Sequence, residues 1–263
     1  MITICKLWLT AFLLSPVFCN LYAQSPQSTG KTETAALPLF KADHPNFQYI
    51  GRIDFSNPSL PKFWSPGVYI KAKFKGSSCE VLINDEVLGG NHNYLEIIID
   101  NKKPFRIQTT GKTNTIKAAG GLSNGDHTIT ICKNTESGIG YLQFAGLKCK
   151  ELLRLETPPL RKIEFIGNSI TCGSGSDVSK VKCDSGQWYD QHNAYLSYGA
   201  ATARNLKAQW HLTAVSGIGL VQSCCNMNIT MPEVFDKMNL RDNSGRWNFK
   251  KYEPQVVTVC LGQ

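Results

Sequence analysis

The sequence predicts a two-part fold, in which a β-sandwich is followed by the first part of an α/β domain with a parallel sheet. Short runs of alternating apolar and polar residues, separated by Pro, Gly, Asn or Asp, fill the chain from Phe47 to about Lys150. After the proline pair at 158–159 the order becomes strand, helix, strand, helix, strand. That order is typical of α/β domains.

The β part is expected to span residues 41–156 and to be a jelly roll. Its expected strands are 49–55, 68–74, 79–85, 94–100, 104–110, 127–134 and 141–149. In one of them Ile70, Ala72 and Phe74 alternate with lysines, which indicates a half-buried strand with a solvated face. The net charge of +8 is scattered along the chain, and no nucleic-acid partner is expected.

The α/β part is expected to span residues 159–263, with the junction stiffened by two prolines so that it packs against the β part. Strands are expected at 162–167, 209–217 and 254–262, and helices at 194–206 and 231–238. The last strand is nearly continuously apolar, which predicts burial on both faces. Because the chain stops just after it, we expect a chain cut inside this domain.

The N-terminus has the features of a signal peptide over residues 1–23. Lys6 precedes a short apolar run, and Ala23 is a plausible cleavage point. The run is too short and too interrupted by Pro16 to span a membrane. Bulky Phe18 disfavours a lipid anchor at Cys19, so a secreted or periplasmic protein is expected, and a surface lipoprotein is the alternative. Residues 24–40 are polar and small and are expected to be a linker.

Export would place the cysteines in an oxidising compartment. Two of the ten lie in the predicted signal, and no paired CxxC motif indicates a zinc site. Cys172 with Cys183 is the disulfide we favour. The adjacent Cys224 and Cys225 are expected to bond elsewhere, since a bridge between neighbours is strained.

Ser169 lies in a glycine-rich turn, FIGNSITCGSG, at the end of the first expected parallel strand. Such a turn can expose a nucleophilic hydroxyl and place backbone N–H groups near a developing oxyanion. A tight turn with a capping serine is the equally weighted alternative. The turn is neither the G-x-S-x-G elbow of α/β-hydrolases nor a phosphate-binding loop.

Three blocks in order resemble the SGNH (GDSL) hydrolases: FIGNSIT, AVSGIGL at 214–220, and VTVCLGQ. With a β-sandwich in front, the chain is similar to the acetyl-esterases of carbohydrate esterase family two. The resemblance implies that Ser169 is the nucleophile and that the N–H groups of Ser169 and Gly217 form the oxyanion hole. It places the Asn donor and the catalytic His beyond Gln263. Asn168 stands where the family usually has Asp, which changes the charge of the loop.

Other candidates are weaker. Trp188 and Tyr189 could stack on a sugar, although burial of at least one against the first helix is favoured. His192 precedes the expected helix and His211 lies within a strand, and neither matches the family's catalytic position. The remaining three histidines are expected at the surface or in turns: His44, His92 and His127.

The leading hypothesis is a secreted serine esterase that removes O-acetyl groups from plant cell-wall-type polysaccharide such as xylan or glucomannan. No metal or organic cofactor is expected, and the partner is an acetylated polysaccharide or oligosaccharide. The present chain is expected to be inactive without the missing His. The alternatives are a non-catalytic carbohydrate-binding β-sandwich with a degenerate appendage, and a lipid or thioester hydrolase.

Overall fold

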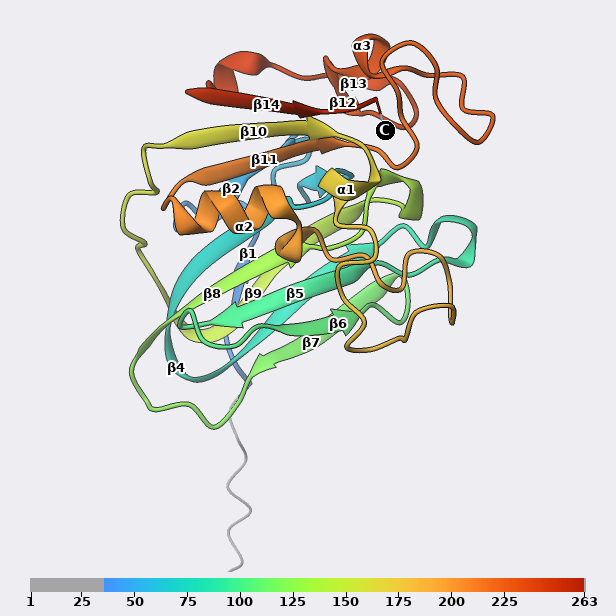
Figure 1. Cartoon of the computed structure of the whole chain (residues 1–263). Coiled ribbons are helices and arrows are strands. Elements are labelled where there is room, and N and C mark those ends of the chain that lie inside the picture. Colours follow the sequence, from blue (N-terminus) through green and yellow to red (C-terminus); the bar gives the residue numbers. More distant parts are fainter. Residues whose placement is uncertain (1–35, 263) are drawn as a thin grey trace, which may run out of the picture. The chain divides into compact units, whose positions relative to one another are not determined.

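A computed structural model describes residues 36–262, and residues from Leu37 onward form one compact unit (Figure 1). The predicted signal peptide and most of the predicted linker lie outside the described residues. No helix within residues 36–262 is long and apolar enough to cross a membrane.

Nine strands of the described residues form one antiparallel sheet with the central order β1-β9-β4-β8-β5-β6; β2 and β7 also pair with β4, and β3 pairs with β9. The strands are β1 (Leu39–Lys41), β2 (Gln48–Ile50), β3 (Lys62–Phe63), β4 (Tyr69–Asp85), β5 (Tyr94–Ile99), β6 (Phe105–Gln108), β7 (Thr113–Ala119), β8 (Asp126–Lys133) and β9 (Leu142–Leu153). Short 3-10 turns lie at Leu88–Gly90 and Ser137–Ile139.

Strand β4 is the strand around which this sheet is organised. Its first half pairs with β8 and its second half with β7, while β9 follows both halves, with a register shift between Lys75 and Cys79. The alternation predicted for the first half is confirmed, because Ile70, Ala72 and Phe74 are almost fully buried. One strand therefore replaces two expected ones, since residues 76–78 stay within β4, at an irregularity in its pairing with β9, instead of forming a turn. The jelly-roll topology stays a prediction.

The second part contains the predicted parallel sheet, in the order β11-β10-β14 (Figure 1). Its strands are β10 (Lys162–Gly167), β11 (Gln209–Ala214) and β14 (Val256–Cys260), and its helices are α1 (Ser169–Cys172), α2 (Tyr198–Asn205) and α3 (Met231–Val234). A hairpin of β12 (Lys237–Asn239) and β13 (Ser244–Arg246) and 3-10 turns at Ala194–Leu196 and Phe249–Lys251 complete it.

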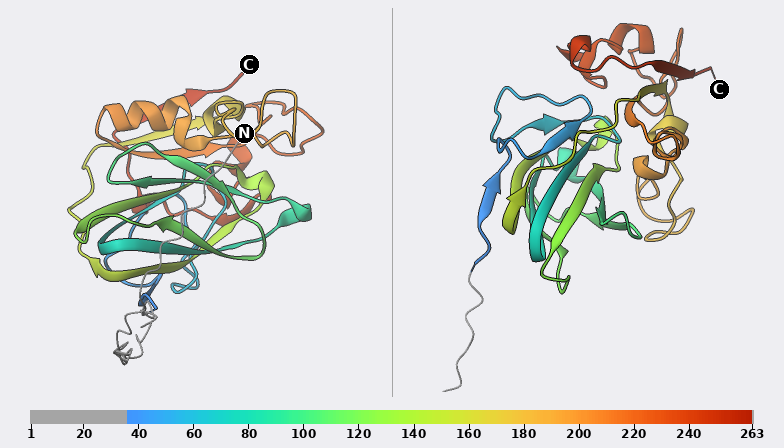
Figure 2. Two further views of the ribbon diagram at one scale, coloured as in Figure 1. Left: turned by 90° about the horizontal axis from the view of Figure 1, so that it is seen from below. Right: turned by 90° about the vertical axis from the view of Figure 1, so that its left-hand side faces the viewer.

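The nine-stranded sheet and the parallel sheet lie in separate layers (Figure 2). Trp210 of β11 stacks on Tyr69 of β4 at 4.0 Å between ring centroids and donates its indole N–H to the Gly67 carbonyl. Arg52 forms a buried ion pair with Glu164 of β10 at 3.2 Å. The predicted packing of the two parts is thus confirmed by apolar and ionic contacts.

Three expectations need correction. The predicted helix at 231–238 ends at Val234, and the chain enters β12 instead. Strand β1 begins at Leu39, inside the expected linker. The valines of β14 are half exposed, not buried on both faces, because no described segment covers this edge strand; they are Val256, Val257 and Val259.

Candidate active site

Ser169 is the first residue of α1 and is separated from the end of the central parallel strand by Asn168 alone. It is half buried and lines a cavity of about 770 Å³ that Gly217 also lines. Strand β10 has β11 on one side and β14 on the other. The carboxyl end of β10 is therefore a switch point, where the strand order of the sheet reverses. Ligands of open α/β sheets bind at such points. The structure therefore brings together the two residues that the sequence singled out.

The turn around Ser169 is fixed by its neighbours. The Asn168 side chain accepts a hydrogen bond from the Ile170 N–H at 3.3 Å, as expected for a neutral cap. A Cβ at Gly167 would lie 2.0 Å from the Thr171 hydroxyl and 2.9 Å from the Cys260 carbonyl. Only glycine therefore allows the strand to pass this close to the helix that carries the nucleophile candidate.

Gly217 follows β11 with a φ of +80°, which favours glycine. Its carbonyl accepts a hydrogen bond from the Cys224 N–H at 2.9 Å, and a Cβ at Gly217 would lie 2.5 Å from Cys224 Sγ. Among the described residues, neither the Gly217 N–H nor the Ser169 N–H donates to a protein acceptor. Two uncommitted donors at one cavity are what an oxyanion hole requires.

The cysteine expectations are wrong on both counts. Cys224 and Cys225 bond to each other. Cys172 and Cys183 are both free thiols, the first buried and the second exposed. Burial raises the pKa of the Cys172 thiol well above its ordinary value, so this group behaves as a packing residue.

Neither histidine of the second part lines the Ser169 cavity. His192 is fully buried, its Nε2 lies 2.8 Å from the Ser174 hydroxyl, and burial together with Arg106 lowers its pKa to about 4. His211 is stacked on Tyr252 at 3.5 Å, and burial lowers its pKa well below the ordinary value. The expectation that neither histidine is the general base stays a prediction.

His127 is the one histidine of the β part whose expected surface position needs correction. It lies within β8, is 7% exposed, and its Nδ1 lies 2.7 Å from Asp100. The hydrogen bond with Asp100 raises its pKa.

Trp188 and Tyr189 lie outside the Ser169 cavity. Trp188 is 54% exposed and meets the His192 ring edge-on at 4.9 Å. Tyr189 is buried, but against Tyr94 and Ile139 of the β part, not against the first helix. Their role in sugar binding stays a prediction.

The loop that carries these aromatic residues is held by the β part. Arg106 of β6 is buried and donates to the carbonyls of Asp190 and His192, both at 2.6 Å. Asn193 donates to Glu96 of β5 at 2.8 Å. Sequence reasoning missed these groups because alternation in a strand shows which side is polar, not that a charged side chain turns inward to a partner.

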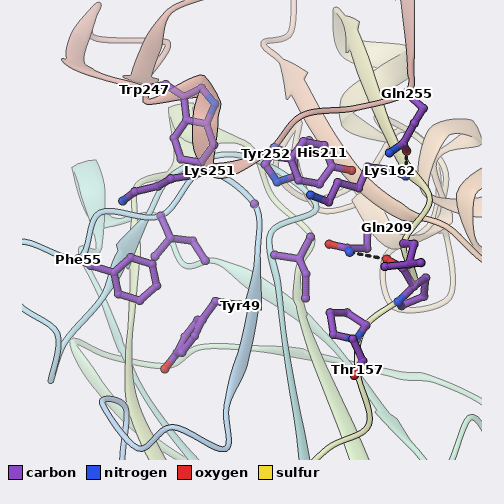
Figure 3. A pocket seen from close by; sticks show the side chains of 16 residues that line it. Tyr49, Phe55, Thr157, Lys162, Gln209, His211, Trp247, Lys251, Tyr252 and Gln255 are labelled. Atoms are coloured by element: carbon purple, nitrogen blue, oxygen red, sulfur yellow. Dashed lines mark hydrogen bonds between the residues drawn. The ribbon is translucent and has the colours of Figure 1, made fainter.

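A second cavity, of about 590 Å³, lies at the amino ends of the parallel strands (Figure 3). Lys162, Gln209 and Gln255 line it from the starts of β10, β11 and β14. It is therefore at the opposite end of β10 from Ser169. Among residues 36–262, no group of three or more His, Cys, Asp or Glu side chains is placed to hold a metal ion.

Comparison with known proteins identifies relatives that cover most of this chain. Residues 49–159 match the model of the carbohydrate esterase 2 N-terminal domain. The chain is thus similar to the family two carbohydrate esterases. Over 227 residues it is 37% identical to the cellulase/esterase CelE of Acetivibrio thermocellus, covering 84% of this chain and 26% of that protein. It is 28% identical to an acetylxylan esterase/glucomannan deacetylase of Cellvibrio japonicus, covering 84% and 62%.

Solved family two esterases have the same fold. A structure from Clostridium thermocellum in complex with cellohexaose is 36% identical, with a TM-score of 0.73, covering 82% of this chain and 65% of that one. A family two esterase from Cellvibrio japonicus is 24% identical, with a TM-score of 0.76, covering 86% and 68%. The chain spans about a quarter and about three fifths of the two curated relatives.

Proposed function

We propose that the complete protein is a secreted serine esterase that removes O-acetyl groups from plant cell-wall polysaccharide. The observation that carries the proposal is the shared cavity of Ser169 and Gly217, with two uncommitted backbone N–H groups at the carboxyl ends of adjacent strands. The names of curated relatives, which include acetylxylan esterase and glucomannan deacetylase, support the substrate class.

In the proposed reaction the Ser169 hydroxyl attacks the acetyl carbonyl and forms a tetrahedral oxyanion, held by the N–H groups of Ser169 and Gly217. A histidine supplied from beyond Gln263 takes the serine proton and gives it to the departing sugar hydroxyl. Water then attacks the acetyl-serine, which releases acetate and restores the hydroxyl. An Asn beyond Gln263 completes the oxyanion hole.

The local test compares two serines of the same turn. Ser169→Ala in the complete protein should lower kcat/KM on an aryl acetate and on acetylated xylan by at least about 10³-fold. Ser174→Ala is the matched control, because Ser174 follows the same one-turn helix but hydrogen-bonds to His192. It should keep activity within a few-fold. Loss of activity in Ser174→Ala with Ser169→Ala active would reverse the assignment.

The dependence on residues beyond Gln263 has its own test. A fragment of residues 24–263 should release acetate at least about 10³-fold more slowly than the complete protein, because Ser Oγ is a weak nucleophile without a base. Equal activity would place the base within the fragment. Retained binding of xylan by a complete protein without esterase activity would favour the non-catalytic alternative.

A further inference from the structure

Glu136 is a buried acidic residue that the proposed reaction does not use. It lies in the connection between β8 and β9, belongs to the β part, and is fully inaccessible to solvent. Buried acidic groups without a role are rare, since burial of charge is costly unless it is compensated. Its partners indicate the role.

The partners of Glu136 belong to the two segments that carry the oxyanion donors. Oε2 accepts a hydrogen bond from the Ser216 N–H at 2.7 Å, directly before Gly217. The same oxygen lies 3.8 Å from the Sγ of Cys172, the last residue of the helix that begins at Ser169. One carboxyl group thus contacts the segments of both Ser169 and Gly217.

The β part also restrains the main chain around Glu136. The ammonium group of Lys133 is fully buried and donates to the carbonyls of Thr135 at 2.6 Å and Glu136 at 3.2 Å. The neighbouring Asn134 carbonyl accepts the Ala194 N–H at 3.1 Å. The second carboxyl oxygen, Oε1, lies 3.8 Å from Nδ1 of His192. The connection is therefore fixed on both sides, and its side chain has little freedom.

We propose that Glu136 is a positioning residue, through which the β part holds the Gly217 segment in the geometry of the oxyanion hole. It touches no reacting atom. The Ser216 N–H bond restrains the backbone one residue before the Gly217 donor. Displacement of reacting groups by about 1 Å can cost about 10²-fold in rate. The inference rests on the proposed esterase function.

The test uses the complete protein, an aryl acetate, and a phosphonate titrant that counts reactive serines. Glu136→Ala should lower kcat per titrated site by about 10²-fold with little change in KM, because the donor and not the substrate site is displaced. Glu136→Gln should stay within about 5-fold, since its amide oxygen can still accept the Ser216 N–H bond. If Glu136→Ala yields no titratable sites, Glu136→Asp, which withdraws the carboxyl group, takes its place with the same expectation.

Glu164→Gln is the matched control. Glu164 is another buried carboxyl group between the two parts, bonded to Arg52 and Thr213, and its kcat per site should equal that of the wild type. A wild-type kcat in Glu136→Ala, or an equal loss of kcat in Glu136→Gln and Glu136→Ala, would contradict the positioning role of Glu136. Esterase turnover by the wild type in the same experiment would still support the proposed function. Absence of turnover by the wild type on every acetyl ester overturns both.

Discussion

Gly217 combines two constraints that can be separated by substitution. Its φ of +80° disfavours any side chain, and Cys224 Sγ occupies the space that a Cβ would need. Gly175 has a similar φ of +67°, but a Cβ there would meet nothing within 4 Å. The two glycines therefore share the backbone requirement and differ in the space around it.

We predict that Gly217→Ala lowers kcat on an aryl acetate by about 10²-fold or more, because the N–H group that we propose as an oxyanion donor moves with the displaced backbone. Gly175→Ala should cost about 1 kcal/mol of unfolding free energy, through its backbone alone, and leave kcat unchanged. Steady-state kinetics and urea unfolding of both variants provide the check. Equal kcat in the two variants would contradict the proposal that the Gly217 N–H belongs to the oxyanion hole.

At the scale of elements, β8 is joined to the end of β5 by an ion pair that titrates. The hydrogen bond that the His127 ring donates to Asp100 raises the pKa of His127 above its ordinary value of about 6.5. The folded state thus binds the proton more tightly than the unfolded state does. The stability from this pair is fully present below the unfolded pKa and is lost as pH rises through the folded pKa.

We predict that the unfolding free energy contains a contribution that falls with pH above about 6.5, and that Asp100→Asn removes it. The Asn oxygen can still accept the Thr128 N–H bond that Asp100 accepts now. Urea unfolding of both proteins at several pH values between about 5.5 and 8.5 measures the difference. The same pH slope in both proteins would contradict the pairing.

Elements with a strong pattern could be predicted from the sequence, and elements that depend on distant contacts could not. Local residues alone predict three of the strands. These are the first half of β4, through its alternation, and β10 and β11, through their apolar runs. The helix expected at 231–238 ends at Val234. Just after it, the guanidinium of Arg52 in the β part donates hydrogen bonds to the carbonyls of Phe235 and Lys237. A tertiary contact overrides the local pattern there.

The candidate site likewise combines residues that local sequence predicts with residues that distant contacts place. That Ser169 and Gly217 lie at one cavity could be predicted, because their glycine turns follow strands in a familiar order of blocks, and their roles stay proposals. The position of Glu136 could not, because a polar residue after a strand is usually solvated, and the partners of its carboxyl group, Ser216 and Cys172, are distant in sequence. The Cys224–Cys225 bond was missed because the adjacent cysteines alone do not show the loop conformation in which they bond.

At the scale of the whole molecule, Arg52 is one of the buried contacts between the two parts. Its guanidinium pairs with Glu164 and donates to two carbonyls of the second part, and 2% of the residue is exposed. Removing one partner of a buried ion pair leaves a charge without compensation. A surface pair of the same protein, Lys73 with Asp126 at 3.1 Å, gives the comparison.

We predict that Arg52→Ala lowers the unfolding free energy by about 3 to 5 kcal/mol. Lys73→Ala, in which a solvent-exposed pair is lost, should change it by less than about 1 kcal/mol. Urea unfolding of the complete protein with both variants measures the two values. A small effect of Arg52→Ala would mean that the stacked Tyr69 and Trp210 hold the parts together without it.

The central claim is that Ser169 is the nucleophile, and covalent labelling tests it most directly. A fluorophosphonate is added to the complete protein, and the modified serine is located by fragment-ion mass spectrometry. Trypsin leaves Ser169 and Ser174 in one peptide, residues 163–180, so the fragment ions must separate them. We expect label on Ser169 and none on Ser174, and loss of labelling in Ser169→Ala. Label on any other serine, with Ser169 unmodified, would contradict the claim.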